Sequence, residues 1–335
     1  METMTVPPPL PRTLPDETLA QAQASLAALR REIAKAFVGQ GEVVDQALAA
    51  LLAGGHVLLE GVPGLGKTLL VRALAAAVQG SFKRIQFTPD LMPSDVMGHA
   101  VWDPKSERFH LRRGPVFTHL LLADEVNRAP AKTQAALLEV MQEAQVSLEG
   151  QSLPVERPFM VFATQNPVEQ EGTYPLPEAQ LDRFLLKVRI GYAGEPEEQA
   201  MVRQVTDGLV GDALRVEAVQ PVLDPAGVLA LQEAAAQVHV DDAVLAYAVA
   251  LARATRTTPG ISLGAGPRGA IALVRAARAS ALLAGRGFAT PDDVKAMAAP
   301  ALRHRIQRAP ETEIEGLTHD DLIATVVTQV PAPRR

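Results

Sequence analysis

The sequence predicts an α/β protein in which a five-stranded parallel sheet, flanked by helices, is followed by a domain built from helices alone. Three observations support this class. Short apolar runs alternate with amphipathic helical segments through residues 56–190, as in the βαβ units of parallel sheets. A glycine-rich stretch, GVPGLGKT at 61–68, joins the first run to a helical segment. From residue 194 onward only helical periodicity and helix caps recur.

The expected strands are continuous apolar runs, which are typical of strands buried on both faces of a sheet. Leucine and alanine at helical spacing predict two helices ahead of the first strand, behind a proline-rich tail at 1–15 that we expect to be extended or disordered. The expected strands are residues 56–60, 83–87, 119–123, 159–164 and 185–190. The expected helices of this part are residues 16–36, 42–53, 69–79, 130–144 and 177–184.

Two hairpins are expected within this part of the chain. Val101-Trp102 and 109–111 flank a polar turn, and 146–155 turns at Glu149-Gly150. Trp102 is the only tryptophan, and a lone tryptophan is more typical of packing than of recognition.

The second part of the chain is alanine-rich and predicts helices without strands. Asp224, Asp241 and Thr290 stand where helix N-caps are expected. The expected helices are residues 195–205, 225–238, 242–256, 267–283, 291–299 and 320–328. We therefore expect a core over residues 16–192, a helical domain over 193–330 and a loose tail at 331–335.

Composition excludes several classes of function. The chain has 335 residues, no cysteine and a formal net charge of -6, so disulfides and thiolate metal sites are impossible and a general nucleic-acid binder is not favoured. No histidines have close metal-ligand spacing. The N-terminus lacks the apolar core of a signal peptide, and no apolar window is long enough to span a membrane. These features predict a cytoplasmic protein.

The spacing G-x-x-x-x-G-K-T between a strand and a helix predicts a phosphate-binding loop. Gly64 and Gly66 let backbone N–H groups turn towards phosphates, and the following helix N-terminus favours negative charge. Lys67 is expected to reach the β- and γ-phosphates, and Thr68 to offer its hydroxyl to Mg²⁺. A glycine-rich turn without a ligand is disfavoured by the strand and helix. The expected nucleotide contacts are Gly61, Pro63, Gly64, Leu65, Gly66, Lys67, Thr68 and Leu69.

Polar residues at two other strand ends complete the predicted site. Asp124 and Glu125 follow the run 119–123; Asp124 would hold Mg²⁺ through water, and Glu125 would polarise the attacking water. Asn166 follows the run 159–164 and can orient that water. In isolation the two acids are more typical of a solvated strand end, and Asn166 is as typical of an amide that caps the next turn. For Arg183, a salt bridge is the simple interpretation.

Seven motifs stand in order along the chain: FVGQ, GVPGLGKT, QFTPDLMPSD, LADEVNRAPAKTQAALLEVMQE, FATQNP, YPLPEAQLDRF and GPRGAI. Together they resemble the MoxR family of the AAA+ ATPases over about residues 34–310. The resemblance implies that Val38 and Gly39 form the adenine pocket, that Asn166 is sensor 1, that Arg183 is an arginine finger reaching a neighbouring subunit, and that Arg268 is sensor 2 on a helical lid. It also implies a hexameric ring or spiral, with the two hairpins facing its pore or surface.

The family implies that ATP hydrolysis with Mg²⁺ drives chaperone-like remodelling, assembly or activation of client protein complexes, together with a partner carrying a von Willebrand factor A domain. Two alternatives remain. A nucleotide-dependent scaffold with slow turnover would use the same residues. A nucleic-acid motor is disfavoured by the acidic net charge and by too little remaining chain for a winged-helix domain. The magnesium chelatase ATPase subunit is a related family with overlapping motifs.

Overall fold

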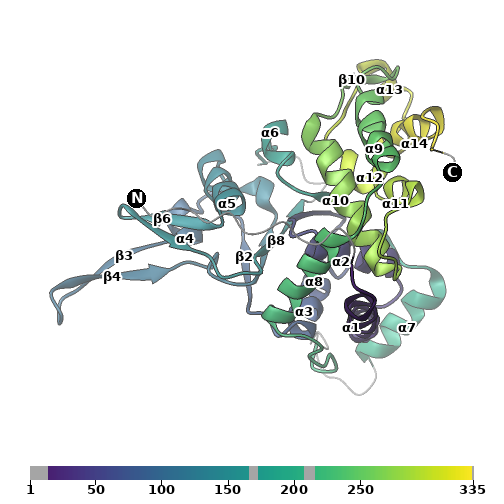
Figure 1. Ribbon diagram of the computed structural model, residues 1–335. Helices are drawn as coiled ribbons and strands as arrows, with labels where there is room; N and C mark the ends of the chain where they lie inside the picture. Colours follow the sequence, from purple (N-terminus) through teal and green to yellow (C-terminus); the bar gives the residue numbers. More distant parts are fainter. Residues whose placement is uncertain (1–13, 166–172, 207–215, 334–335) are drawn as a thin grey trace, which may run out of the picture.

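The computed structural model of the chain describes residues 14–165, 173–206 and 216–333 (Figure 1). A five-stranded sheet lies at its centre, and all of its neighbouring strands pair in parallel in the order β2-β5-β8-β1-β9. The predicted five-stranded parallel sheet is confirmed. Its strands are β1 (Val57–Glu60), β2 (Phe82–Gln86), β5 (Leu120–Asp124), β8 (Met160–Gln165) and β9 (Leu186–Arg189).

The two faces of the sheet are covered by different elements. Val57 and Leu59 of β1 pack into one apolar core with the first three helices and the helical domain, whereas Leu58 packs into a second core with α4 and α5. Alternation along a strand sends neighbouring side chains to opposite faces, so both faces require apolar residues. The helices of the core are α1 (Asp16–Ala34), α2 (Gly41–Leu52), α3 (Lys67–Ala77), α4 (Pro93–Met97), the 3₁₀ turn η1 (Val126–Arg128), α5 (Ala131–Glu143) and α6 (Glu178–Leu181).

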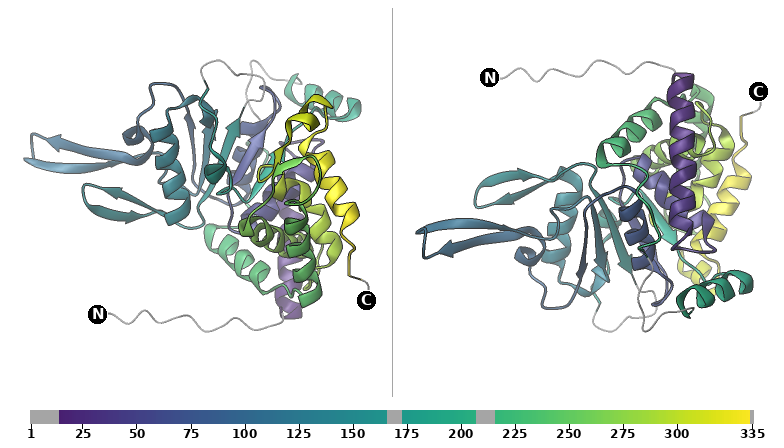
Figure 2. Two further views of the ribbon diagram at one scale, coloured as in Figure 1. Left: turned by 90° about the horizontal axis from the view of Figure 1, so that it is seen from above. Right: turned by 90° about the horizontal axis from the view of Figure 1, so that it is seen from below.

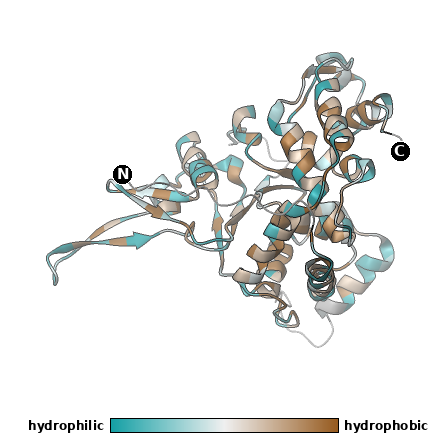
Figure 3. Ribbon diagram, viewed as in Figure 1, coloured by the Kyte–Doolittle hydropathy of each residue, from teal (hydrophilic) through white to brown (hydrophobic). Residues whose placement is uncertain are grey.

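Two hairpins project from the same side of the molecule, as the expected turns predict (Figure 2). They are β3 (Gly98–Asp103) with β4 (Arg108–Arg113), and β6 (Gln145–Leu148) with β7 (Gln151–Pro154). Trp102 and Phe109 face each other across the first hairpin with ring centroids 5.1 Å apart, and both remain largely exposed. Trp102 therefore packs on one neighbour without entering a core, and Figure 3 shows hydrophilic and hydrophobic stretches along this hairpin.

The second part of the chain is mainly helical. The caps at Asp224, Asp241 and Thr290 are confirmed, since each side chain lies at a helix N-cap. No helix in the described ranges combines the length and apolarity needed to cross a bilayer. The helices are α7 (Glu195–Thr206), α8 (Pro225–Gln237), α9 (Asp242–Ala254), α10 (Pro267–Leu283), α11 (Pro291–Ala296), α12 (Ala298–Leu302), α13 (Pro310–Ile314) and α14 (His319–Gln329).

The expectation that this domain has no strands is wrong. β10 (Ile261–Leu263) and β11 (Gln307–Arg308) form a small antiparallel sheet between helices. Two segments this short carry no periodic pattern, and their pairing is fixed by tertiary packing rather than by local sequence. The helix expected over 291–299 is likewise divided at Met297, where α11 ends and α12 begins.

The helical domain shares its core with the start of the chain. α10 packs against α1 and α2, α8 also packs against both, and α1 packs in addition against α3. Arg30 of α1 donates to the carbonyl oxygen of Leu283 at the end of α10, at 3.0 Å. α8 and α10 therefore lie beside the amino ends of the strands, whereas Asp320 of α14 pairs with Arg189 at the carboxyl end of β9.

Candidate active site

The glycine-rich loop begins where β1 ends and continues into α3. Gly64 and Gly66 have φ angles of 87° and 80°, a left-handed conformation that favours glycine. A Cβ atom on Gly66 would lie 3.2 Å from the ring of Phe37, whereas one on Gly64 would meet nothing within 4 Å. The loop thus packs on Phe37 at one side and is open at Gly64. This leaves room for a ligand above the N-terminus of α3.

Lys67 is the first residue of α3, and its side chain turns back onto the loop. Its Nζ donates to the carbonyl oxygens of Gly61 and Val62, at 2.6 and 3.2 Å. Burial lowers the pKa of Lys67, while the nearby charges of Asp124 and Glu125 oppose that shift. The structure therefore brings together the lysine and the two acids that the sequence predicts to share a site.

Asp124 is the last residue of β5, and both oxygens of its carboxylate are engaged. Thr164 Oγ1 donates to Oδ1 at 2.5 Å, and Arg84 Nη2 forms an ion pair with Oδ2 at 2.6 Å. The Arg84 side chain is half exposed whereas that of Asp124 is nearly buried, so the guanidinium can move into solvent when another cation takes its place.

Glu125 adopts a left-handed φ of 54° at the turn after β5. Its backbone N–H donates to Thr164 Oγ1 at 2.8 Å, and its Oε2 accepts from Gln86 at 2.8 Å and from Arg128 at 3.0 Å. The hydroxyl of Thr164 thus links Asp124 to Glu125. The two donors, Gln86 and Arg128, fix the position of the Glu125 carboxylate.

Sequence reasoning missed these partners. Arg84 and Gln86 lie on β2, which pairs with β5, and Gln86 is in register with Asp124. Thr164 follows the register pair Ala123 and Ala163 between β5 and β8. These partners are distant in sequence from Asp124 and Glu125, so they could be identified only once the order of the strands was known. The predicted sensor, Asn166, lies outside the described residues.

The donor set at this edge fits a nucleotide and a magnesium ion. The hydroxyl of Thr68 and the carboxylate of Asp124 are hard oxygen ligands of the kind that Mg²⁺ prefers. Backbone N–H groups of the loop and the ammonium group of Lys67 suit phosphate oxygens. The loop is not blocked by a neighbouring side chain at Gly64, because a Cβ there would meet nothing within 4 Å.

Val38 and Gly39 lie between this loop and α7. Their neighbour Phe37 contacts Gly66, and a Cβ on Gly39 would lie 2.4 Å from the Cβ of Glu197. Gln40 donates to the carbonyl oxygen of Gly191 at 3.2 Å. The segment predicted to hold adenine is therefore next to the loop on one side and the first turn of α7 on the other.

Arg183 and Arg268 lie at the edge of the sheet where the strands begin, opposite the edge that carries the glycine-rich loop. Arg183 Nη1 donates to the carbonyl oxygen of Leu138 at 2.7 Å, and Arg268 lies 3.8 Å from Asp182. Both line a cavity of about 410 Å³ beside Gly55, which precedes β1. The length of β1, about 13 Å, separates this edge from the loop that follows the strand. The structure brings the two arginines to each other and not to Lys67 of the same chain.

Comparisons with known proteins agree with this architecture. A model of the ATPase family associated with various cellular activities (AAA) matches residues 56–186, and a model of the AAA lid domain matches residues 253–326. A crystal structure of a candidate ATPase from Cytophaga hutchinsonii superposes with a TM-score of 0.87 at 39% identity, covering 95% of this chain and 98% of that one.

Three relatives are similar over most of their length. A protein of Bacillus subtilis named YeaC is 45% identical, covering 90% of this chain and 92% of its own. The protein named Chaperone MoxR1 of Mycobacterium tuberculosis is 41% identical, with coverages of 90% and 81%. Protein MoxR of Methylorubrum extorquens is 34% identical, with coverages of 95% and 98%.

Proposed function

Because the chain belongs to the MoxR family of AAA+ ATPases, we propose that it binds ATP and Mg²⁺ at residues 61–69 and hydrolyses the γ-phosphate. The observation that supports this most is the convergence of Lys67, Asp124 and Glu125 at the carboxyl edge of the sheet. Ligands of open α/β sheets bind at that edge.

Each residue has a defined task in this reaction. Lys67 exchanges the carbonyl oxygens of Gly61 and Val62 for phosphate oxygens. Thr68 and Asp124 would hold the magnesium ion, and Asp124 releases Arg84 when it does so. When bound, Mg²⁺ neutralises charge on the β- and γ-phosphate oxygens.

Glu125 is the residue we propose to activate the attacking water. Its carboxylate accepts hydrogen bonds from Gln86 and Arg128 at Oε2. These bonds fix the position of the carboxylate, and the attacking water would bind to an oxygen that they leave accessible. Asn166 is proposed to orient the same water, and Val38 and Gly39 to contact the adenine.

Arg183 and Arg268 complete the site of a neighbouring subunit. Phosphoryl transfer is accelerated mainly by positive charge placed against the γ-phosphate, and an arginine supplied in trans contributes about 10³–10⁵ in rate. Both arginines lie at the far edge of the sheet from Lys67. A head-to-tail arrangement would therefore place the arginines of one subunit against the nucleotide bound by the next. We infer a hexameric ring or spiral of such subunits, each with a core over 16–192 and a lid over 193–330.

The work of the ring is proposed to be chaperone-like remodelling, assembly or activation of client protein complexes, with a von Willebrand factor A domain partner. The name of the relative Chaperone MoxR1 supports this. The β3–β4 hairpin, with Trp102 and Phe109 exposed, offers an extended surface for such proteins.

A slow, switch-like turnover is the second candidate function. Lys67, Asp124 and Glu125 are all held by hydrogen bonds or ion pairs within the chain.

The roles of Lys67 and Glu125 are separable by binding and turnover. Lys67→Ala is expected to lose ATP affinity, whereas Glu125→Gln is expected to bind ATP and retain it unhydrolysed. Fluorescent nucleotide binding and phosphate release, measured on both variants and the parent protein, test this. Equal ATP affinity in the two variants would contradict the assigned roles. Parent turnover that is fast without any partner would exclude the switch.

A further inference from the structure

One face of α10 carries a basic stripe that is exposed except at Arg278, which is half-buried. Arg268, Ile271, Arg275 and Arg278 recur at three- and four-residue spacing, so they lie on the same side of the helix. Ile271 is 56% exposed although it is a large apolar side chain. The stripe begins at Arg268, the residue proposed to face a neighbour's phosphates, and extends about 15 Å along the helix.

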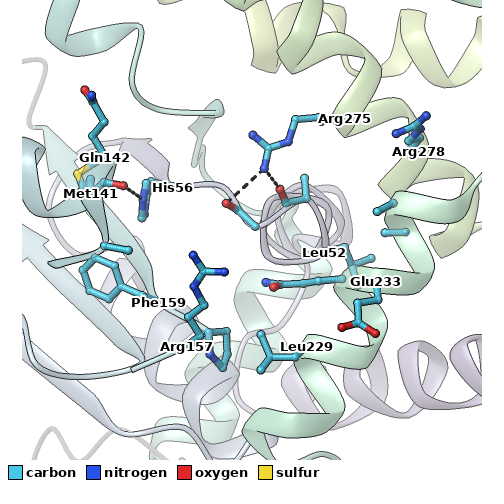
Figure 4. Close-up of a pocket in the computed structure, with 17 residues that line it drawn as sticks. Leu52, His56, Met141, Gln142, Arg157, Phe159, Leu229, Glu233, Arg275 and Arg278 are labelled. Carbon is cyan, nitrogen blue, oxygen red and sulfur yellow. Dashed lines mark hydrogen bonds between the residues drawn. The ribbon is translucent and has the colours of Figure 1, made fainter. Parts of the chain in front are cut away.

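This stripe borders a cavity of about 810 Å³ between α8, α10 and the ends of α2 and α5. Figure 4 shows Arg157 and Arg275 extending towards the middle of the cavity from opposite sides, with Arg278 at its margin. The smaller cavity that contains Arg183 and Arg268 shares part of this lining, including Gly54, His56 and Arg275. The basic cavity is therefore continuous with the arginine-finger edge.

The positive charge of the cavity is not neutralised within the described part of the chain. Neither Arg157 nor Arg278 has an ion-pair partner among the described residues, and Arg278 Nε is buried without a hydrogen-bond partner there. Arg275 donates to the carbonyl oxygens of Ala53 and Gly54. The only acid in the lining, Glu233, forms no ion pair with these arginines. Arg157 and Arg275 are exposed to solvent and Arg278 is half-buried, so the cavity presents positive charge that favours an anionic occupant.

The first turns of α7 carry the complementary pattern. Glu195, Glu198 and Val202 recur at three- and four-residue spacing, are exposed, and line a shallow hollow of about 600 Å³. Val202 is 57% exposed. The intervening acid, Glu197, instead lies against Gly39. The acidic stripe of α7 therefore lies at the adenine side of the nucleotide site.

We propose that the basic cavity receives α7 of the adjacent subunit, with Glu195 and Glu198 of that helix pairing with Arg157 and Arg278. The inference rests on the head-to-tail assembly proposed above, in which the finger edge of one subunit faces the nucleotide edge of the next. Val202 then packs near Ile271, so that each stripe places an apolar residue opposite the other. Docking of α7 would couple the adenine side of one subunit to the lid of its neighbour.

Charge reversal in the Glu125→Gln background, which retains ATP, tests this pairing. The double variant Arg157→Glu/Arg278→Glu is expected to require about a hundredfold more protein for ATP-driven assembly, because like charges would then meet. Glu195→Arg/Glu198→Arg is expected to show the same loss. Sedimentation velocity with ATP and Mg²⁺ measures the mass. Arg253→Glu reverses a charge at an exposed position of α9 that lines neither cavity; it is the control and should assemble as the parent does.

Mixing the two reversed variants in equal amounts gives the decisive arm. Where the two variants alternate, each cavity with reversed charge meets an α7 with reversed charge, and each natural cavity meets a natural α7. Opposite charges then face each other at every interface, so assembly should return. A folding defect in either variant would not be repaired by mixing. Normal assembly of the arginine variant, or failure of the mixture to recover, would overturn the inference while leaving the ring intact. If the Glu125→Gln protein itself stays monomeric with ATP, the proposed ring is wrong, and the docking of α7 is wrong as well.

Discussion

The two edges of the central sheet differ in how their charges are satisfied. At the nucleotide edge, Lys67, Asp124 and Glu125 each have hydrogen-bond or ion-pair partners in the same chain. At the opposite edge, Arg157 and Arg278 have no ion-pair partner among the described residues. In the proposed mechanism, the first edge is a resting site that a ligand opens, and the second is completed when another molecule supplies negative charge.

The largest expected effect comes from the incomplete edge. Arg183→Ala should lower turnover by about 10³–10⁵ while leaving ATP affinity nearly unchanged, because in the proposed ring the arginine acts on a neighbour's γ-phosphate. Steady-state phosphate release and equilibrium ATP binding measure the two quantities. Arg183→Lys is the matched control; it keeps the charge but not the planar fork, and should recover only part of the rate. Normal turnover in Arg183→Ala would show that Arg183 takes no part in hydrolysis at a neighbour's nucleotide site.

A second effect concerns the floor of the basic cavity. Burial lowers the pKa of His56 to about 4; its Nε2 donates to the carbonyl oxygen of Met141, and its Nδ1 accepts from the N–H of Val161. An unfolded histidine has a pKa near 6.5, so the unfolded state binds the proton first as the pH falls. Stability of about 3 kcal/mol is therefore present above pH 6.5 and is lost progressively towards pH 4.

Urea unfolding at several pH values checks this sign. His56→Gln should be less stable at pH 7 and should lose less stability between pH 6.5 and 4 than the parent protein. His304, whose pKa burial also lowers, remains in both proteins and contributes the same background slope. Identical slopes in the two proteins would show that His56 is not the group responsible.

The smallest effect sharpens the account of the nucleotide edge. Arg84→Met removes the cation that pairs with Asp124, so the apparent affinity for Mg²⁺ in the presence of ATP should rise a few-fold, roughly twofold to fivefold. Arg84→Lys retains the charge and should change little. Titration of nucleotide binding with Mg²⁺ measures the effect. A weaker Mg²⁺ affinity in Arg84→Met would mean that Arg84 supports the loaded site instead of competing with the ion.

The same contrast explains what sequence alone could predict. The loop at 61–68 and the apolar strand runs are local signals, and they predicted the sheet and one edge of the site. Arg84 and Gln86 were missed because only the pairing of β2 with β5 brings them to Asp124 and Glu125. The cavity was missed for the same reason: Arg157, Arg275 and Arg278 meet only when α10 packs beside the amino ends of the strands.

The claim that two subunits share each active site is tested most directly by mixing two inactive variants. Glu125→Gln carries a defect at the nucleotide edge, and Arg183→Ala carries one at the finger edge. In an equal random mixture, roughly a quarter of the interfaces would combine an intact Glu125 with an intact Arg183. We predict that ATP hydrolysis reappears on mixing, in proportion to those sites. Turnover no higher than that of either variant alone would contradict a shared site.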